Sequence, residues 1–161
     1  MKIEASAALS LAAVIRNDLQ AVGDLEQHAR ELPRDQLRRA ELDSLGFALH
    51  NLYNALENAW AQISASFEDH VRDRTRWHRE LIEKMLLDLG PLRPAVLPPT
   101  ARPLLTDLLG FRHLFRHAYD STLDEARTLA LWRRWQAEGD AVKEALAAFA
   151  AQLTRIGEGT V

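Results

Sequence analysis

The chain has 161 residues, of which 47% are hydrophobic and 7% aromatic, and its formal net charge at pH 7 is −3. This length favours one domain, because a single core can bury roughly two-thirds of the unfolded surface of such a chain. The mild negative charge argues against a protein that coats nucleic acid non-specifically, and the absence of cysteine excludes disulfides, a thiolate nucleophile and a cysteine zinc site.

Targeting signals and membrane segments are not evident in the sequence. No apolar run approaches membrane-spanning length, and the first residues lack the pattern of a secretion signal. We therefore expect a soluble, cytoplasmic protein. The chain is rich in residues that favour helix and poor in β-branched ones. We predict an all-α fold, an up-down bundle of five to six helices that forms a single domain over 1–161, with a frayed tail within 153–161.

Two long amphipathic helices are predicted in the first half of the chain. Apolar residues recur every three to four positions from Ala5 to Leu32, and Pro33 ends that run. A second stripe continues from Asp35 to Glu68 with nearly strict spacing, which predicts a helix on the order of 50 Å long. A seven-residue repeat of this length predicts small crossing angles, as in an up-down bundle or an antiparallel dimer.

A polar, charged connection follows, and Thr75 is predicted to cap a short helix that ends at Leu89-Gly90. Four arginines gather at the start of this helix: Arg72, Arg74, Arg76 and Arg79. Acidic residues are interleaved with them, so we favour a solvated surface over a patch that guides RNA. These arginines are secondary candidates for RNA contacts.

Residues 90–99 include four prolines and predict a rigid connector, after which Thr100 is expected to cap the next helix. The apolar face of this helix carries Leu104, Leu108, Phe111 and Phe115. On the opposite face a small, polar stripe is spaced by four, three and four: Thr106, Gly110, His113 and His117. Glycine inside a helix costs about 1 kcal/mol relative to alanine, so Gly110 predicts the close approach of a partner helix, for which we favour a second copy of the chain.

The last third is predicted to contain two further helices. A break is expected at 120–121, and 122–125 has the pattern of a capping box. The fifth helix then carries three apolar residues toward Gly139: Leu129, Trp132 and Trp135. A sixth helix is predicted from about Asp140 to about Ile156.

The segment Arg112-His113-Leu114-Phe115-Arg116-His117-Ala118-Tyr119 concentrates the chemistry of the chain, with two arginines, two imidazoles and a phenol. On one ideal helix, residues five apart point roughly 140° away from each other, so Arg112 and His117 cannot meet at one substrate by stacking along the helix. Either the helix ends near His117, or two copies of it face each other across a two-fold axis and pool their side chains.

Arg112, His117 and Tyr119 resemble the Arg-x4-His-x-Tyr motif of the HEPN ribonuclease toxins, in their HepT-like branch, and a looser likeness extends over about 42–149. The resemblance implies a homodimer that cleaves RNA without a metal or other cofactor. It also implies a minimal nucleotidyltransferase antitoxin as partner. His113 departs from the family pattern, because many members carry asparagine directly after the motif arginine.

These residues suit an endoribonuclease site shared between two chains. The imidazole of His117 would take the proton from a ribose 2′-OH and protonate the 5′-oxygen, since histidine titrates near neutral pH. Arg112 would hold the phosphate and stabilise its developing charge. His113, Arg116 and Tyr119 are supporting candidates. The resemblance implies that Tyr119 accepts AMP from the nucleotidyltransferase, whereas the residue alone equally suits an amphipathic ring at a helix end.

Two other interpretations remain open from the sequence. His113 and His117 lie four residues apart on one helix, a spacing that can bind zinc, although no third ligand is evident. Alternatively, the chain is a non-catalytic helical dimer that binds a nucleotide or a protein partner, in which Arg and His serve electrostatics and packing.

Overall fold

The structure is a computed structural model that describes residues 1–68, 77–117 and 123–159, with the side chain of His117 outside the description. Over these ranges the chain is helical and has no strand, so the predicted all-α class is confirmed. The elements are α1 (Ala5–Arg30), α2 (Arg39–Phe67), α3 (Trp77–Leu86), the 3-10 helix η1 (Pro99–Ala101), α4 (Arg102–His117) and α5 (Glu125–Gly157).

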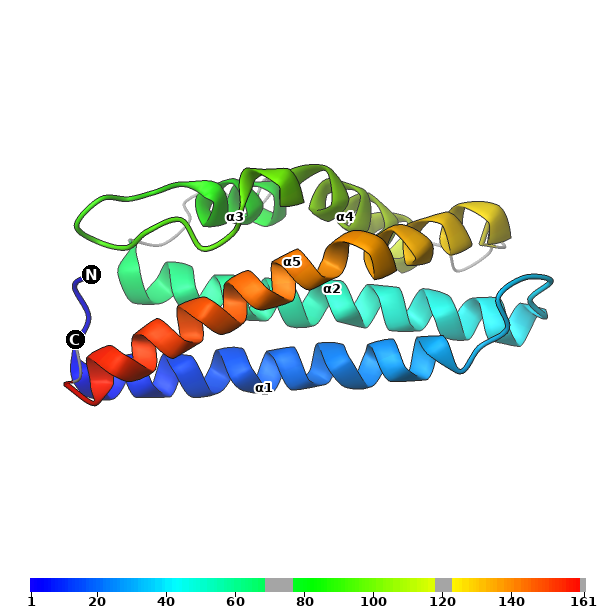
Figure 1. Cartoon of the computed structure of the whole chain (residues 1–161). Helices are drawn as coiled ribbons and strands as arrows, with labels where there is room; N and C mark the ends of the chain where they lie inside the picture. Colours follow the sequence, from blue (N-terminus) through cyan, green and yellow to red (C-terminus); the bar gives the residue numbers. More distant parts are fainter. Residues whose placement is uncertain (69–76, 118–122, 160–161) are drawn as a thin grey trace.

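Helices α1 and α2 run side by side in opposite directions along the molecule, and α5 crosses obliquely over both (Figure 1). The shorter α3 and α4 pack against each other and against α2. Apolar stripes from α1, α2 and α5 meet in one core, in which Ile15, Leu49 and Leu146 are almost completely buried. No helix of the described residues is long and apolar enough to cross a membrane.

The first two helices form where the spacing predicts them, but α2 begins four residues late. Gln36 has a φ of 51°, a left-handed conformation that interrupts a helix at this point. Arg38 is the N-cap instead, and its backbone N–H donates to the Glu41 carboxylate at 2.8 Å. The turn after Pro33 therefore continues through Leu37 before the long stripe becomes helical.

The predicted break at Gly139 is wrong, because α5 is one continuous helix of 33 residues. Gly139 is buried inside it, and a Cβ there would lie 2.7 Å from two ring atoms of Trp135. The glycine makes room for the indole and does not end the helix. Leu153 near the C-terminal end of α5 is also buried, and the helix continues through Gly157.

Two predicted helix caps are also corrected. Asp124 is the N-cap of α5 and accepts a 3.0 Å hydrogen bond from the backbone N–H of Arg127, as a carboxylate at this position commonly does. Thr100 does not cap α4, because Pro99 starts the 3-10 turn that leads directly into that helix. The predicted break at 120–121, and the residues Thr75 and Thr122, lie outside the described residues.

The predicted connector at 90–99 is confirmed over 90–98, whereas Pro99 already belongs to η1 and α3 ends at Leu86, earlier than the predicted Leu89. The completely buried Arg93 anchors this connector. The guanidinium donates from Nε to Glu68 Oε1 at 3.1 Å and again to that oxygen from Nη2. The remaining donors reach the backbone oxygens of Leu87, Pro94 and Lys84 at 3.0–3.2 Å. All five N–H groups of Arg93 thus have a partner, which ties the connector to the ends of α2 and α3.

Candidate functional site

Arg112 turns inward from α4 and is only 8% exposed. Its Nε donates to Asn54 Oδ1 of α2 at 2.7 Å, and its Nη2 lies 3.5 Å from Glu57 Oε1, one helical turn further along α2. Its Nη1 lies 3.3 Å from Nε2 of His78, in the first turn of α3. The motif arginine is therefore the point at which α2, α3 and α4 meet.

The carboxylate of Glu57 contacts both His78 and Arg112. Its Oε2 lies 2.6 Å from Nδ1 of His78, while Oε1 faces Arg112. The two contacts of the ring assign the tautomer, because Nδ1–H donates to the carboxylate and the lone pair on Nε2 accepts from Arg112. The His78 side chain remains 26% exposed, so the imidazole joins the ion pair of Arg112 and Glu57 to the surface.

A second imidazole extends this network along α2. Asn54 donates from Nδ2 to Nε2 of His50 at 3.0 Å, and the His50 ring stacks on Phe115 of α4 with centroids 5.1 Å apart. Burial lowers the pKa of His50, and the positive charges of Arg112 and Arg116 lower it further. A neutral His50 therefore accepts from Asn54 and leaves the amide oxygen free for Arg112.

Tyr53 forms the apolar floor beneath the guanidinium, with its ring centroid 5.8 Å from the Cζ atom of Arg112. Its hydroxyl is buried and has no hydrogen bond of normal geometry to a described residue. Burial, followed by the charge of the nearby Glu57, raises the pKa of Tyr53 far above its usual value. The phenol stays protonated and provides a face on which the cation rests.

The other motif residues are placed only in part. His113 is exposed, and its ring meets the ring of His78 edge to face at 5.7 Å. Arg116 is also exposed. His117 is the last residue of α4, its side chain is not described, and Tyr119 lies outside the described residues. The structure thus brings Arg112 and His113 together with His78, whereas the predicted contribution of His117 and Tyr119 stays a prediction.

The two predicted faces of α4 differ in burial as the spacing indicates. Leu104 and Leu108 are completely buried on the apolar side. On the other side Thr106, Gly110 and His113 are exposed, and a Cβ added to Gly110 would meet no atom within 4 Å. The polar stripe is therefore exposed to solvent in the single chain. Of the arginines near α3, Arg79 is exposed, and Arg72, Arg74 and Arg76 lie outside the described residues.

The partners of Arg112 were not predicted from the sequence. His50, Asn54 and Glu57 are spaced by four and three along α2, so they form a polar row beside the apolar stripe of that helix. This row is visible in the sequence. Nothing in the sequence pairs it with Arg112 or with His78, because these contacts depend on how three helices cross.

The described residues do not gather the ligands of a metal site. In 1–68, 77–117 and 123–159, no three His, Cys, Asp or Glu side chains lie close enough to hold a metal ion. The sequence also suggests a zinc site at His113 and His117. The side chain of His117 lies outside the described residues, so this site is not tested.

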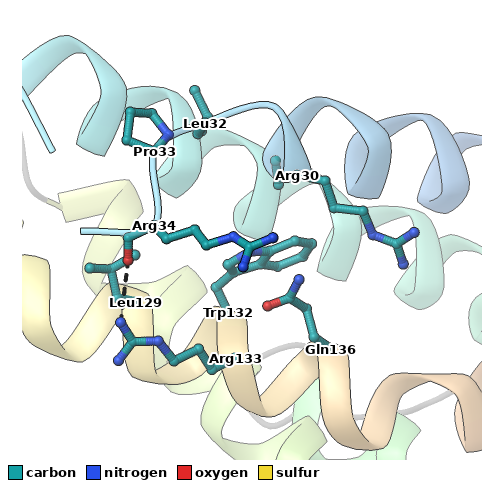
Figure 2. A pocket seen from close by; sticks show the side chains of 9 residues that line it. Arg30, Leu32, Pro33, Arg34, Leu129, Trp132, Arg133 and Gln136 are labelled. Atoms are coloured by element: carbon teal, nitrogen blue, oxygen red, sulfur yellow. Dashed lines mark hydrogen bonds between the residues drawn. The ribbon is translucent and has the colours of Figure 1, made fainter.

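A separate basic pocket of about 480 Å³ lies where the end of α1, the α1–α2 connection and α5 meet. Its lining includes three arginines, Arg30, Arg34 and Arg133, and no acidic residue. Figure 2 shows Arg34, Trp132 and Gln136 around the same hollow, and Arg133 donates to the backbone oxygen of Arg34 at 3.3 Å. The pocket is a concentration of positive charge on a chain that is negative overall.

Comparison of the chain with curated proteins and with solved structures gave no match. A family model described as "HepT-like protein" matches residues 44–153, which extend from α2 into α5 and include Asn54, Glu57, His78 and Arg112. The match covers more than half of the chain. The chain therefore belongs to the HepT-like family of HEPN proteins.

Proposed function

We propose that the chain is a metal-independent endoribonuclease toxin in which Arg112 binds the scissile phosphate and His117 transfers protons. The observation that carries this proposal is the set of unused donors on Arg112. Among the described residues, Asn54 and His78 take one N–H each, and Glu57 lies 3.5 Å from Nη2. A guanidinium has five N–H groups, so the described residues leave at least one donor on each Nη nitrogen for a ligand.

Arg93 is an arginine with a structural role, and Arg112 can be compared with it. Both arginines are buried, Arg93 with an exposed fraction of 0% and Arg112 with 8%. Arg93 pairs with Glu68, the C-terminal cap of α2, and Arg112 pairs with Glu57 of the same helix. Arg93 has a partner for every N–H. Because an unpaired buried donor costs about 1–3 kcal/mol, the incomplete pairing of Arg112 within the described part of the chain favours a site that an anion completes.

The proposed reaction is transesterification at the RNA phosphate. The 2′-oxygen loses its proton to an imidazole and attacks phosphorus, while the 5′-oxygen leaves and takes a proton from an imidazolium. The products are a 2′,3′-cyclic phosphate and a 5′-hydroxyl end. Arg112 stabilises the charge on the non-bridging oxygens, and its fixed orientation lowers the reorganisation needed at that moment.

The proposed enzyme is a homodimer, with the exposed stripe of α4 at its two-fold axis. The open space beside Gly110 permits the close approach of a second α4. Leu114, next to the stripe, is 55% exposed and would supply apolar area to this contact. Two copies of α4 would then bring His113, Arg116 and His117 of each chain into one cleft.

The basic pocket supports binding of the RNA backbone away from the reacting phosphate. Guanidinium groups bind phosphate oxygens well, and contacts of this kind weaken as salt rises. Reversal of charge at both Arg34 and Arg133 should therefore weaken RNA binding and reduce its salt dependence, while the rate at saturating RNA stays unchanged.

We further propose that a minimal nucleotidyltransferase encoded beside this chain is its antitoxin and transfers AMP to Tyr119. Family membership supports this pairing. A bulky anionic group on Tyr119, two residues after His117, would repel the RNA phosphates at the cleft.

One observation favours a second candidate function, a non-catalytic dimer that binds a nucleotide or protein partner. Arg112 makes three contacts inside its own chain and is mostly buried, as a purely structural arginine would be. In that case Arg112→Ala changes stability or ligand affinity, and there is no turnover to lose.

RNA cleavage by the purified chain in excess chelator separates these functions. We expect cleavage to persist and to leave a 2′,3′-cyclic phosphate. Arg112→Ala should lower the rate by about 10²- to 10³-fold at matched folded concentration, and Arg112→Lys should recover little of it. Absence of cleavage, or equal cleavage by wild type and by the Arg112→Ala, His117→Ala double variant, would leave the binding function.

A further inference from the structure

Within one chain, the imidazole that faces the guanidinium of Arg112 comes from α3 and lies outside the motif. We propose that His78 is a second catalytic residue, the general base that takes the proton from the ribose 2′-OH, and that Glu57 is its positioning residue. This inference rests on the proposed RNA cleavage and deepens it.

The first argument is the position of His78 relative to the phosphate binder. Residues five apart on a helix diverge by roughly 140°, so Arg112 and His117 of one chain do not converge along α4. His78 reaches Arg112 from another helix, with Nε2 at 3.3 Å from Nη1. A phosphate oxygen about 2.8 Å from the same Nη1 would therefore lie within a few ångströms of Nε2, and the attacking 2′-OH adjoins that phosphate.

The second argument is the contact of His78 with Glu57. The 2.6 Å contact between Nδ1 and Oε2 holds the proton on Nδ1 and leaves the lone pair of Nε2 pointing toward Arg112. A carboxylate behind an imidazole holds the ring in the tautomer that a general base requires. It also stabilises the imidazolium that forms when Nε2 takes a proton.

The resting contacts provide a way to couple phosphate binding to proton transfer. In the free chain an N–H of Arg112 occupies the lone pair of Nε2. A phosphate oxygen that accepts this N–H releases the lone pair for the 2′-OH. The 2′-O–H bond then breaks, its proton moves to Nε2, and the 2′-oxygen bonds to phosphorus. The 5′-oxygen leaves with a proton from protonated His117 of the second chain in the proposed dimer.

The groups that face His78 set the pH dependence of this step. Glu57 faces it from α2, and Arg112 and His113 face it from α4. In general, a negative charge beside an imidazole favours the imidazolium and a positive charge opposes it. The rate should rise with pH as Nε2 becomes free of a proton. Glu57→Gln removes the charge that favours the imidazolium, so it should shift this acid limb of the profile to lower pH.

A purely structural His78 would also lower activity when it is removed, so the variants must separate the two roles. His78→Asn retains an amide that can donate to Glu57 as Nδ1 does, but it has no atom at the Nε2 position. His78→Ala leaves space for imidazole added to the buffer. The matched control is His28→Asn on α1, where the ring of His28 contacts the hydroxyl of Ser44 at 2.7 Å, away from the site.

The experiment measures single-turnover cleavage of a synthetic RNA oligonucleotide by the full-length chain, with folding of each variant checked by circular dichroism and thermal melting. We expect a loss of 10²- to 10⁴-fold in His78→Asn and in His78→Ala, and no change in His28→Asn. Added imidazole should restore cleavage in His78→Ala in proportion to its neutral form, and it should not do so in His78→Asn.

Three outcomes would overturn the proposal. If folded His78 variants cleave within about threefold of wild type while His117→Ala is inactive, His78 is not the base and the ribonuclease function stands. If activity is lost, imidazole does not restore it in His78→Ala, and Glu57→Gln does not shift the pH profile, His78 is structural. If the wild-type chain cleaves no RNA at any pH, the proposed function fails and this inference fails with it.

Discussion

The amide oxygen of Asn54 accepts a 2.7 Å hydrogen bond from Nε of Arg112, which joins two helices across 58 positions of the sequence. This bond directs both Nη nitrogens away from Asn54, one toward Glu57 and one toward His78. The orientation of the guanidinium therefore depends on an uncharged residue that has no direct role in the proposed chemistry.

We predict that Asn54→Ala lowers both stability and cleavage. Loss of a hydrogen bond to a charged group, with the donor left buried, costs about 1.5–3 kcal/mol. Urea denaturation measures this loss, and cleavage kinetics at matched folded concentration measures the effect on the rate. Asn51→Ala is the control, because Asn51 donates only to the backbone oxygen of Phe47 one turn away, and it should change stability by about 0.5 kcal/mol or less. Equal effects at the two positions would contradict the orienting role of Asn54.

A second prediction compares two glycines inside long helices. A Cβ on Gly46 would lie 2.6 Å from Leu123 and 2.8 Å from the Phe115 ring, whereas one on Gly23 would meet nothing within 4 Å. Gly46→Ala should therefore destabilise the chain, since overpacking costs about 1–3 kcal/mol and alanine returns only about 1 kcal/mol of helix propensity. Gly23→Ala should stabilise it by up to about 1 kcal/mol. Thermal melting of both variants checks the contrast in sign, and stabilisation by both would show that Phe115 moves freely.

The long helices and the polar face of α4 could be predicted from the sequence, because apolar spacing reports directly which side of a helix is buried. The position of Gly139 inside a continuous helix could not be predicted, because a glycine that accommodates the Trp135 ring has the same local sequence pattern as one that ends a helix. The contacts of Arg112 with Glu57 and His78 also escaped prediction. They depend on crossing angles among three helices, and no residue spacing within one helix encodes them.

A third prediction concerns acid stability. Burial and the charges of Arg112 and Arg116 lower the pKa of His50 below its ordinary value of 6.5. The unfolded chain then binds a proton more readily than the folded one, so the contribution of His50 to stability is complete above about pH 6.5 and declines as pH falls toward the lowered pKa. Urea denaturation at pH 7.5 and 5.5 should show this decline in wild type. His50→Gln keeps an oxygen that can accept from Asn54, but its side chain does not titrate. The stability of this variant should therefore depend less on pH than that of wild type. An unchanged pH dependence would exclude His50 as the cause of the decline.

The last prediction tests the two-fold contact at α4. The space beside Gly110 is open in the single chain, so Gly110→Leu should fold normally and, as a helix residue, gain up to about 1 kcal/mol. If a second α4 packs there, the leucine side chain fills the space between the two backbones and blocks association. Sedimentation velocity should then show a folded monomer, and cleavage should fall with the loss of the shared cleft.

Gly23→Leu on α1, also next to open space, is the matched control and should leave both the dimer and the activity intact. A Gly110→Leu variant that remains dimeric would place the contact on another face. A variant that is monomeric yet fully active would contradict the shared cleft.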